Sequence, residues 1–184
     1  MPETISKEDI YNILEKVQDP EVPVLSIIDL GVVRDINLSQ DEVEIIITPT
    51  YTGCPAMDMI EVGIKSTLQD HGFEKIKITT ILTPAWTTDW LSESGKEKLR
   101  AYGIAPPQGA AKSKRALFSE ESGIICPQCN STNTEMISQF GSTACKAQYK
   151  CSDCEEPFDY FKCCLLYTSP SPRDATLSRM PSSA

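Results

Sequence analysis

The chain has 184 residues, 40% of them hydrophobic, which is enough for one domain of ordinary size and one small one. Its formal net charge of −9 excludes nucleic acid and anionic membranes as expected partners, because both carry phosphate that repels an acidic surface. No apolar run approaches the roughly 20 residues of a transmembrane helix, and the first residues lack the basic start and apolar stretch of a secretory signal. We therefore expect a cytoplasmic protein, in which patterned cysteines are metal ligands or reactive thiols rather than disulfides.

The first half of the chain has the pattern of a small α/β domain. Ser6 and Asp9 resemble a capping box, and apolar residues then recur at helical spacing over Lys7–Gln18 until Asp19 and Pro20 end the helix. The elements predicted after it are strands over 30–38, 42–48 and 75–82 and helices over 55–72 and 94–102. Together they predict a mixed sheet of three or four strands, with helices, in a domain over residues 1–104.

Composition divides the rest of the chain into a linker, a cysteine-rich module and a tail. Residues 105–122 are rich in Pro, Gly, Ala, Lys and Ser without periodicity, which is typical of a linker. A metal-binding module follows over 123–163. The stretch 164–184 has neither helical nor strand period, and we expect it to be disordered and non-native, like translated non-coding sequence. The predicted fold class is α+β: a small α/β domain plus a C-terminal module resembling a zinc ribbon.

The strongest local pattern is a pair of Cys-x-x-Cys motifs. Cys126 and Cys129 form the first, Cys151 and Cys154 form the second, and 21 residues separate them. Two residues between cysteines allow a tight turn that points both sulfurs inward, so that the pairs can hold opposite sides of a tetrahedral ion. The spacing predicts a closed structural zinc site, with an iron-sulfur cluster as the alternative. The module has too few apolar residues to fold alone, so the metal would supply much of its stability.

Two further cysteines, Cys145 and Cys163, lie near these motifs in the sequence. Six thiols are more than one tetrahedral ion can use. Each of the two is therefore either an alternative ligand or a small buried apolar residue. The adjacent Cys164 belongs to the tail that we expect to be non-native.

Cys54 follows a predicted strand and directly precedes the second predicted helix. An exposed thiol at this position would face free N–H groups and the positive end of the helix dipole, which favour the thiolate and lower its pKa. Gly53 allows a close approach of the backbone. The placement predicts a reactive or iron-binding cysteine, and the alternative is a buried structural cysteine that caps the helix.

An acidic, proline-containing loop supplies three carboxylates, from Asp19, Glu21 and Asp29. Carboxylates held on such a loop can ligate a hard cation or assist a thiolate-bound metal. They can equally cap helices and turns, and the spacing alone favours that role. Because the chain contains one histidine and no assured base for nucleophilic catalysis, we assign no catalytic residue.

Four segments together resemble the PaaD family, the accessory proteins of the multicomponent phenylacetyl-CoA epoxidase. They are the stretches 19–33, 48–57, 84–90 and 140–147. The resemblance extends over residues 6–163 and implies a SufT-like iron-sulfur assembly domain followed by a cysteine-rich metal module. It implies that Asp19, Glu21 and Asp29 form an acidic signature and that Cys54 is the reactive cysteine. It places the metal module on the two Cys-x-x-Cys motifs.

The resemblance implies a function in aerobic phenylacetate degradation: the assembly or maintenance of the epoxidase's iron or iron-sulfur centres, rather than oxidation of the substrate. The implied partners are the oxygenase and reductase subunits of the epoxidase and the iron-sulfur assembly machinery. Cys145 and Cys163 also match the family pattern, which favours a structural or cluster role for them. The chain departs from the family by continuing for about twenty residues beyond Cys163, which supports a non-native tail and puts a ligand role for Cys164 in doubt.

Three other functions remain open. The first is a general iron-sulfur assembly factor with many clients. The second is a zinc ribbon that binds nucleic acid, although the acidic residues of the module outnumber its lysines and argue against it. The third is an enzyme subunit in which Cys54 attacks a thioester, for which the sequence shows no base or oxyanion partner.

Overall fold

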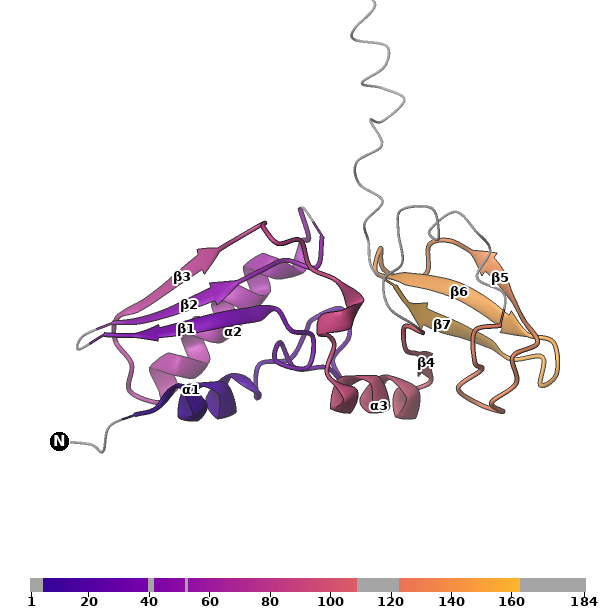
Figure 1. Cartoon of the computed structure of the whole chain (residues 1–184), viewed down its shortest axis with the longest axis horizontal. Coiled ribbons are helices and arrows are strands. Elements are labelled where there is room, and N and C mark those ends of the chain that lie inside the picture. Colours follow the sequence, from indigo (N-terminus) through magenta and orange to yellow (C-terminus); the bar gives the residue numbers. More distant parts are fainter. Residues whose placement is uncertain (1–4, 40–41, 52, 109–122, 163–184) are drawn as a thin grey trace, which may run out of the picture.

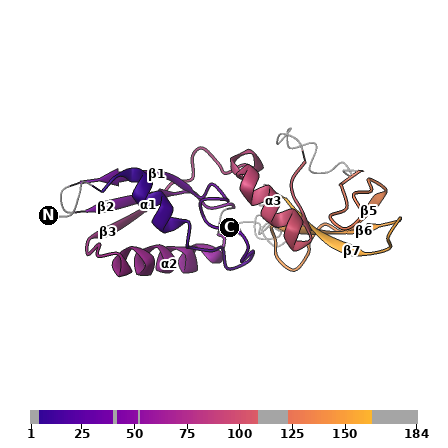
Figure 2. The same ribbon diagram turned by 90° about the horizontal axis from the view of Figure 1, so that it is seen from below.

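Two β-sheets lie at opposite ends of the molecule, with helix α3 (Glu93–Tyr102) between them (Figures 1 and 2). The computed structural model describes residues 5–39, 42–51, 53–108 and 123–162. This arrangement of mixed sheets and helices confirms the predicted α+β fold class. The predicted tail and most of the predicted linker lie outside the described residues.

The first helix, α1 (Lys7–Leu14), begins at the capping box that the sequence predicts. The Ser6 hydroxyl accepts a hydrogen bond from the Asp9 N–H at 3.2 Å, and the Asp9 carboxylate accepts one from the Ser6 N–H at 2.9 Å. The helix is shorter than predicted, because Gln18 forms a β-bridge with Ser26. This pairing draws the end of the predicted helix into an extended loop.

The N-terminal sheet is formed by β1 (Val33–Leu38), β2 (Val43–Ile47) and β3 (Ile76–Thr80), with β1 antiparallel and β3 parallel to β2. A parallel pair needs a crossover connection, which α2 (Ala56–Asp70) supplies. Every second residue of β2 and every fourth residue of α2 is buried, as the two periodicities require. The largest of these residues are Val43, Ile45, Ile47, Ile60, Ile64 and Leu68. Since α1 contacts both α2 and β1, one core joins the helices to the sheet.

The loop before β1 packs closely against the segment that leads to α3. Gly31 has a φ of +66°, and a Cβ at this position would lie 2.5 Å from the carbonyl oxygen of Trp90. Trp90 ends a short 3-10 helix, η1 (Thr88–Trp90). On the same loop, the Leu30 carbonyl accepts a hydrogen bond from the indole N–H of the buried Trp86 at 2.8 Å. Only glycine suits both the backbone angle and the space at position 31.

The C-terminal sheet has the strand order β4-β7-β6-β5. Its strands are β4 (Ile104–Ala105), β5 (Thr134–Ser138), β6 (Lys146–Cys151) and β7 (Pro157–Phe161). The last three are antiparallel neighbours, whereas β4 pairs in parallel with β7. Because β4 directly follows α3 and its Gly103 cap, it attaches this sheet to the N-terminal part of the chain. No pattern in the sequence led us to expect β4 or β7.

The buried side chains form two clusters. The larger one contains the N-terminal sheet and its helices, and it also takes in Cys145 and Phe161 from the C-terminal sheet. The rings of Trp86 and Phe161 meet edge to face, with 6.3 Å between their centroids. The smaller cluster lies inside the C-terminal sheet and includes Cys126 and Cys151. Among the described residues, no helix has the length and apolar character needed to cross a membrane.

Candidate metal centre

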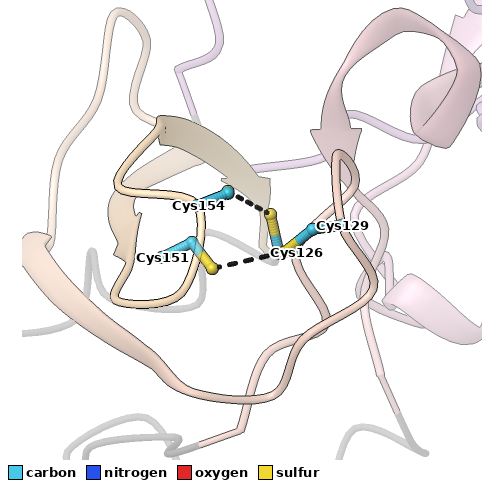
Figure 3. A group of neighbouring side chains, drawn as sticks. All are labelled: Cys126, Cys129, Cys151 and Cys154. Atoms are coloured by element: carbon cyan, nitrogen blue, oxygen red, sulfur yellow. Dashed lines mark hydrogen bonds between the residues drawn. The ribbon is translucent and has the colours of Figure 1, made fainter.

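Four cysteines from two turns at the C-terminal sheet converge on one point (Figure 3). Their sulfur atoms all lie within 4.8 Å of one another, with 3.7 Å between Cys126 and Cys154 and 3.5 Å between Cys129 and Cys151. Four sulfurs bound at about 2.3 Å to a tetrahedral zinc ion would lie about 3.8 Å apart. The cysteines can therefore hold an ion with little movement. The protein would fill all four positions, as it does in structural sites.

Each Cys-x-x-Cys turn is closed by the backbone. The Cys126 carbonyl accepts a hydrogen bond from the Asn130 N–H at 2.9 Å, and the Cys151 N–H donates to the Glu156 carbonyl at 3.0 Å. The residues that directly follow the two turns, Asn130 and Glu155, have φ angles of 61° and 62°. This left-handed conformation turns the chain back on itself, and Asn adopts it more readily than Glu. The turns thus present their sulfurs to the same point.

Polar side chains tie the two turns together. The Asp153 carboxylate, in the second turn, accepts hydrogen bonds from the Ser131 hydroxyl and from Asn133 Nδ2, the latter at 2.9 Å. Both donors follow the first turn in the chain. The same bonds lower the pKa of Asp153, so this carboxylate stays charged and keeps accepting them.

The four thiols cannot ionise independently of one another. The Cys154 N–H favours the Cys151 thiolate and lowers its pKa to about 7. The Ser131 N–H favours the Cys129 thiolate as well, but desolvation and the neighbouring thiols outweigh it and raise the pKa of Cys129 to about 12. Adjacent thiolates repel one another, and a bound divalent cation removes this conflict. The donor set therefore fits zinc or another thiophilic cation.

Cys54 lies apart from this cluster, two residues before α2. It is only 9% exposed, so the expectation of an exposed thiol is wrong. Burial raises the pKa of Cys54, although the Ala56 N–H and the Tyr51 hydroxyl favour the thiolate. The expected lowering of the pKa is therefore wrong as well, because the loss of hydration outweighs the helix N-terminus. A cation bound to the sulfur would reverse this balance.

The three predicted carboxylates fall into two groups. Asp29 lies within the N-terminal part, where it accepts hydrogen bonds from the Ser92 hydroxyl at 2.9 Å and from the Lys98 ammonium at 2.6 Å. Asp19 and Glu21 share the loop that follows α1, and the Asp19 carboxylate accepts a hydrogen bond from the Glu21 N–H at 2.8 Å. Burial raises the pKa of Asp19. The Glu21 side chain instead reaches the C-terminal sheet.

Cys145 lies against Glu21, away from the four-cysteine cluster. Its thiol donates to the Glu21 carboxylate at 3.3 Å and lies 3.0 Å from the Thr143 hydroxyl. The next residue, Lys146, is 7% exposed and donates to the Glu21 carbonyl at 3.4 Å. Lys146 was not expected at this contact, since no local spacing indicates an interaction between residues 125 positions apart. Cys163, the other extra cysteine, lies outside the described residues.

Two family descriptions match separate parts of the chain. Residues 7–78 match "Iron-sulfur cluster assembly protein", and residues 110–162 match "PaaD zinc beta ribbon domain". The first match contains Cys54 and all three predicted carboxylates, and the second contains the four-cysteine cluster.

Individual proteins are similar to the chain over different lengths. The PaaD component of 1,2-phenylacetyl-CoA epoxidase from Escherichia coli (strain K12) is 46% identical over 155 residues, which cover 84% of this chain and 92% of that protein. The "Fe-S protein maturation auxiliary factor" of Porphyromonas gingivalis (strain ATCC BAA-308 / W83) is 32% identical over 96 residues, which cover 51% of this chain and 90% of that protein. A crystal structure of a DUF59 domain from Bacillus anthracis is 28% identical, with a TM-score of 0.48, over 50% of this chain and 90% of that chain.

Proposed function

We propose, because this chain belongs to the PaaD family of 1,2-phenylacetyl-CoA epoxidase components, that it is an accessory protein for assembling the metal centre of such an epoxidase. Its proposed partners are the oxygenase and reductase subunits of that enzyme and the iron-sulfur assembly machinery, in the cytoplasm. The near full-length similarity supports the link to the epoxidase. The match to an iron-sulfur assembly family supports a role in assembly rather than in oxidation of the substrate.

The observation that carries the proposal is the presence of two unlike cysteine sites. The four-cysteine cluster is closed, so an ion bound there would have no free position for exchange. We assign it zinc, which would hold the two turns of the ribbon together and stabilise the fold. Cys54 lies near the acidic Glu21, outside that cluster, and is the residue that we assign to iron or an iron-sulfur unit as cargo.

Metal analysis of the purified full-length chain tests this division. The protein is prepared without oxygen, with Cys54 intact or replaced by Cys54→Ala, and incubated with ferrous iron and sulfide before zinc, iron and acid-labile sulfide are measured. One zinc in both forms, and iron or sulfide only with Cys54 intact, is the expected result. Cys164→Ala, which removes a thiol from the tail, is the matched control and should behave as the unchanged chain does. Zinc alone in every form would reduce Cys54 to a structural residue.

A general iron-sulfur assembly factor is the second candidate. The Porphyromonas gingivalis maturation factor matches this chain over nearly its whole length, which favours a shared assembly activity. That match leaves about half of this chain, including the ribbon, without a counterpart in the comparison. We therefore favour a function directed to one enzyme, with the ribbon as the docking element. Equal transfer of iron to an unrelated iron-sulfur protein and to the epoxidase would support the general factor instead.

A further inference from the structure

Cys145 belongs structurally to the N-terminal core, although the sequence places it in the ribbon module. Cys145 and Cys54 are both buried members of the larger cluster, whereas Cys126 and Cys151 belong to the smaller one. The Cys145 thiol points at the Glu21 carboxylate, 3.3 Å away. The contact therefore joins the two parts of the chain through a thiol and a carboxylate, both of which are metal-binding groups.

Glu21 is held in place from both sides of this contact. Its N–H donates to the Asp19 carboxylate at 2.8 Å, and its carbonyl accepts from the Lys146 ammonium at 3.4 Å. Its carboxylate also acts on Cys54, where its negative charge is one of the groups that raise the pKa of the thiol. One fixed carboxylate thus faces two buried thiols that come from distant parts of the chain.

We propose that Cys54, Cys145 and Glu21 form a second metal site between the two parts of the chain, which takes a thiophilic divalent ion such as Fe²⁺ as cargo. The proposal rests on the proposed function of Cys54 and adds a ligand from the ribbon module to it. Two thiolates and one carboxylate suit iron, cobalt or zinc, and the thiol protons pass to solvent when the ion binds.

The geometry of this site differs from that of the four-cysteine cluster in the way that cargo requires. Metal–sulfur and metal–oxygen bonds of about 2.3 and 2.1 Å place a neighbouring sulfur and oxygen about 3.6 Å apart, close to the Cys145–Glu21 separation of 3.3 Å. Among the described residues, three or more ligand atoms lie within 4.8 Å of one another only in the ribbon. The Cys54 sulfur must therefore move to complete the interface site. Three protein ligands also leave a fourth position open, through which the ion can be passed on.

Cobalt titration of the zinc-loaded, full-length chain tests the proposal, with Co²⁺ as the probe because its thiolate complexes absorb visible light. The unchanged chain is expected to bind one Co²⁺ in addition to its zinc, with thiolate-to-cobalt absorption. Cys145→Ser and Cys54→Ser are each expected to weaken this binding at least about tenfold and to reduce the absorption per ion. Glu21→Gln, which preserves the shape of the side chain, is expected to weaken binding while leaving both thiolates. The control is Ser142→Ala, at an exposed position three residues before Cys145, which should bind cobalt as the unchanged chain does.

Retention of one zinc per chain shows that each variant is folded. If Cys145→Ser binds cobalt normally while Cys54→Ser does not, the proposed interface site is wrong and the function proposed for Cys54 stands. If Ser142→Ala loses cobalt to the same extent as Cys145→Ser, the loss is not specific to the thiol and the site is again wrong. If the unchanged chain binds no ion beyond its zinc, both the site and the cargo function of Cys54 are overturned.

Discussion

Replacing Asp29 by alanine is expected to destabilise the N-terminal part of the chain without changing the amount of metal bound. The Asp29 carboxylate is buried and accepts hydrogen bonds from the Ser26 N–H, from the hydroxyls of Ser26 and Ser92, and from the Lys98 ammonium. Losing the first three costs about 1 kcal/mol each. The Lys98 side chain is 42% exposed, so its loss adds at most about 1 kcal/mol. The free energy of unfolding should therefore fall by about 3 to 4 kcal/mol.

Urea denaturation followed by circular dichroism measures this loss. The matched control is Asp35→Asn, because the Asp35 side chain is 52% exposed and its ion pair with Lys7, at 2.8 Å, is open to solvent. The control should change stability far less than Asp29→Ala does. Equal effects of the two substitutions, or a loss of bound iron at unchanged stability, would refute the structural role and return Asp29 to the candidate metal ligands.

The contribution of Asp29 also has a defined pH dependence. Burial alone would raise the pKa of Asp29, but the bonds from Lys98, Ser26 and Ser92 outweigh it and hold the pKa below its ordinary value. A carboxyl whose pKa is lowered on folding stabilises the fold above its unfolded pKa of about 3.9, and this contribution is lost as the pH falls through the folded value. The stability difference between the unchanged chain and Asp29→Ala should be complete at about pH 7 and shrink below about pH 4.

Two further predictions concern a tight contact and the ribbon metal. Gly31→Ala is expected to lower the free energy of unfolding by about 2 to 4 kcal/mol, because its Cβ would meet the Trp90 carbonyl at a positive φ. Gly53→Ala, with positive φ but open space, is expected to cost about 1 kcal/mol; equal losses in urea would contradict the close contact. Removing the ribbon metal with a chelator should expose β6 amides to hydrogen exchange while β2 stays protected, and unchanged protection of β6 would argue against metal-dependent stability.

Local patterns in the sequence predict most of the N-terminal part. The capping box at Ser6 and the glycine cap at Gly103 both occupy their expected places. The three strands and the crossover helix α2 also form where alternation and helical spacing predict them. These features depend on residues a few positions apart, so a sequence displays them directly. The pairing of the two Cys-x-x-Cys motifs was predictable for a different reason, since a common ion imposes a recognisable spacing.

Features that depend on distant residues were not predictable. The two-residue strand β4 exists because β7, more than 50 residues later, supplies its partner. The burial of Cys54 and the contact of Cys145 with Glu21 both depend on how the two parts of the chain pack. The helix N-terminus before α2 was a valid reason to expect a low pKa for Cys54, but the sequence does not show the burial that outweighs it.

Strand β6 links the two metal sites that we assign to this chain. Its last residue, Cys151, is a ligand of the four-cysteine cluster, and Cys145 directly precedes its first residue, Lys146. Six residues of extended chain cover about 20 Å, so the two sites are separate but joined by one rigid element. A metal in the ribbon would fix one end of β6 and thereby hold the other end against Glu21. Zinc in the ribbon is then a condition for the interface site, since without it the position of Cys145 would no longer be determined.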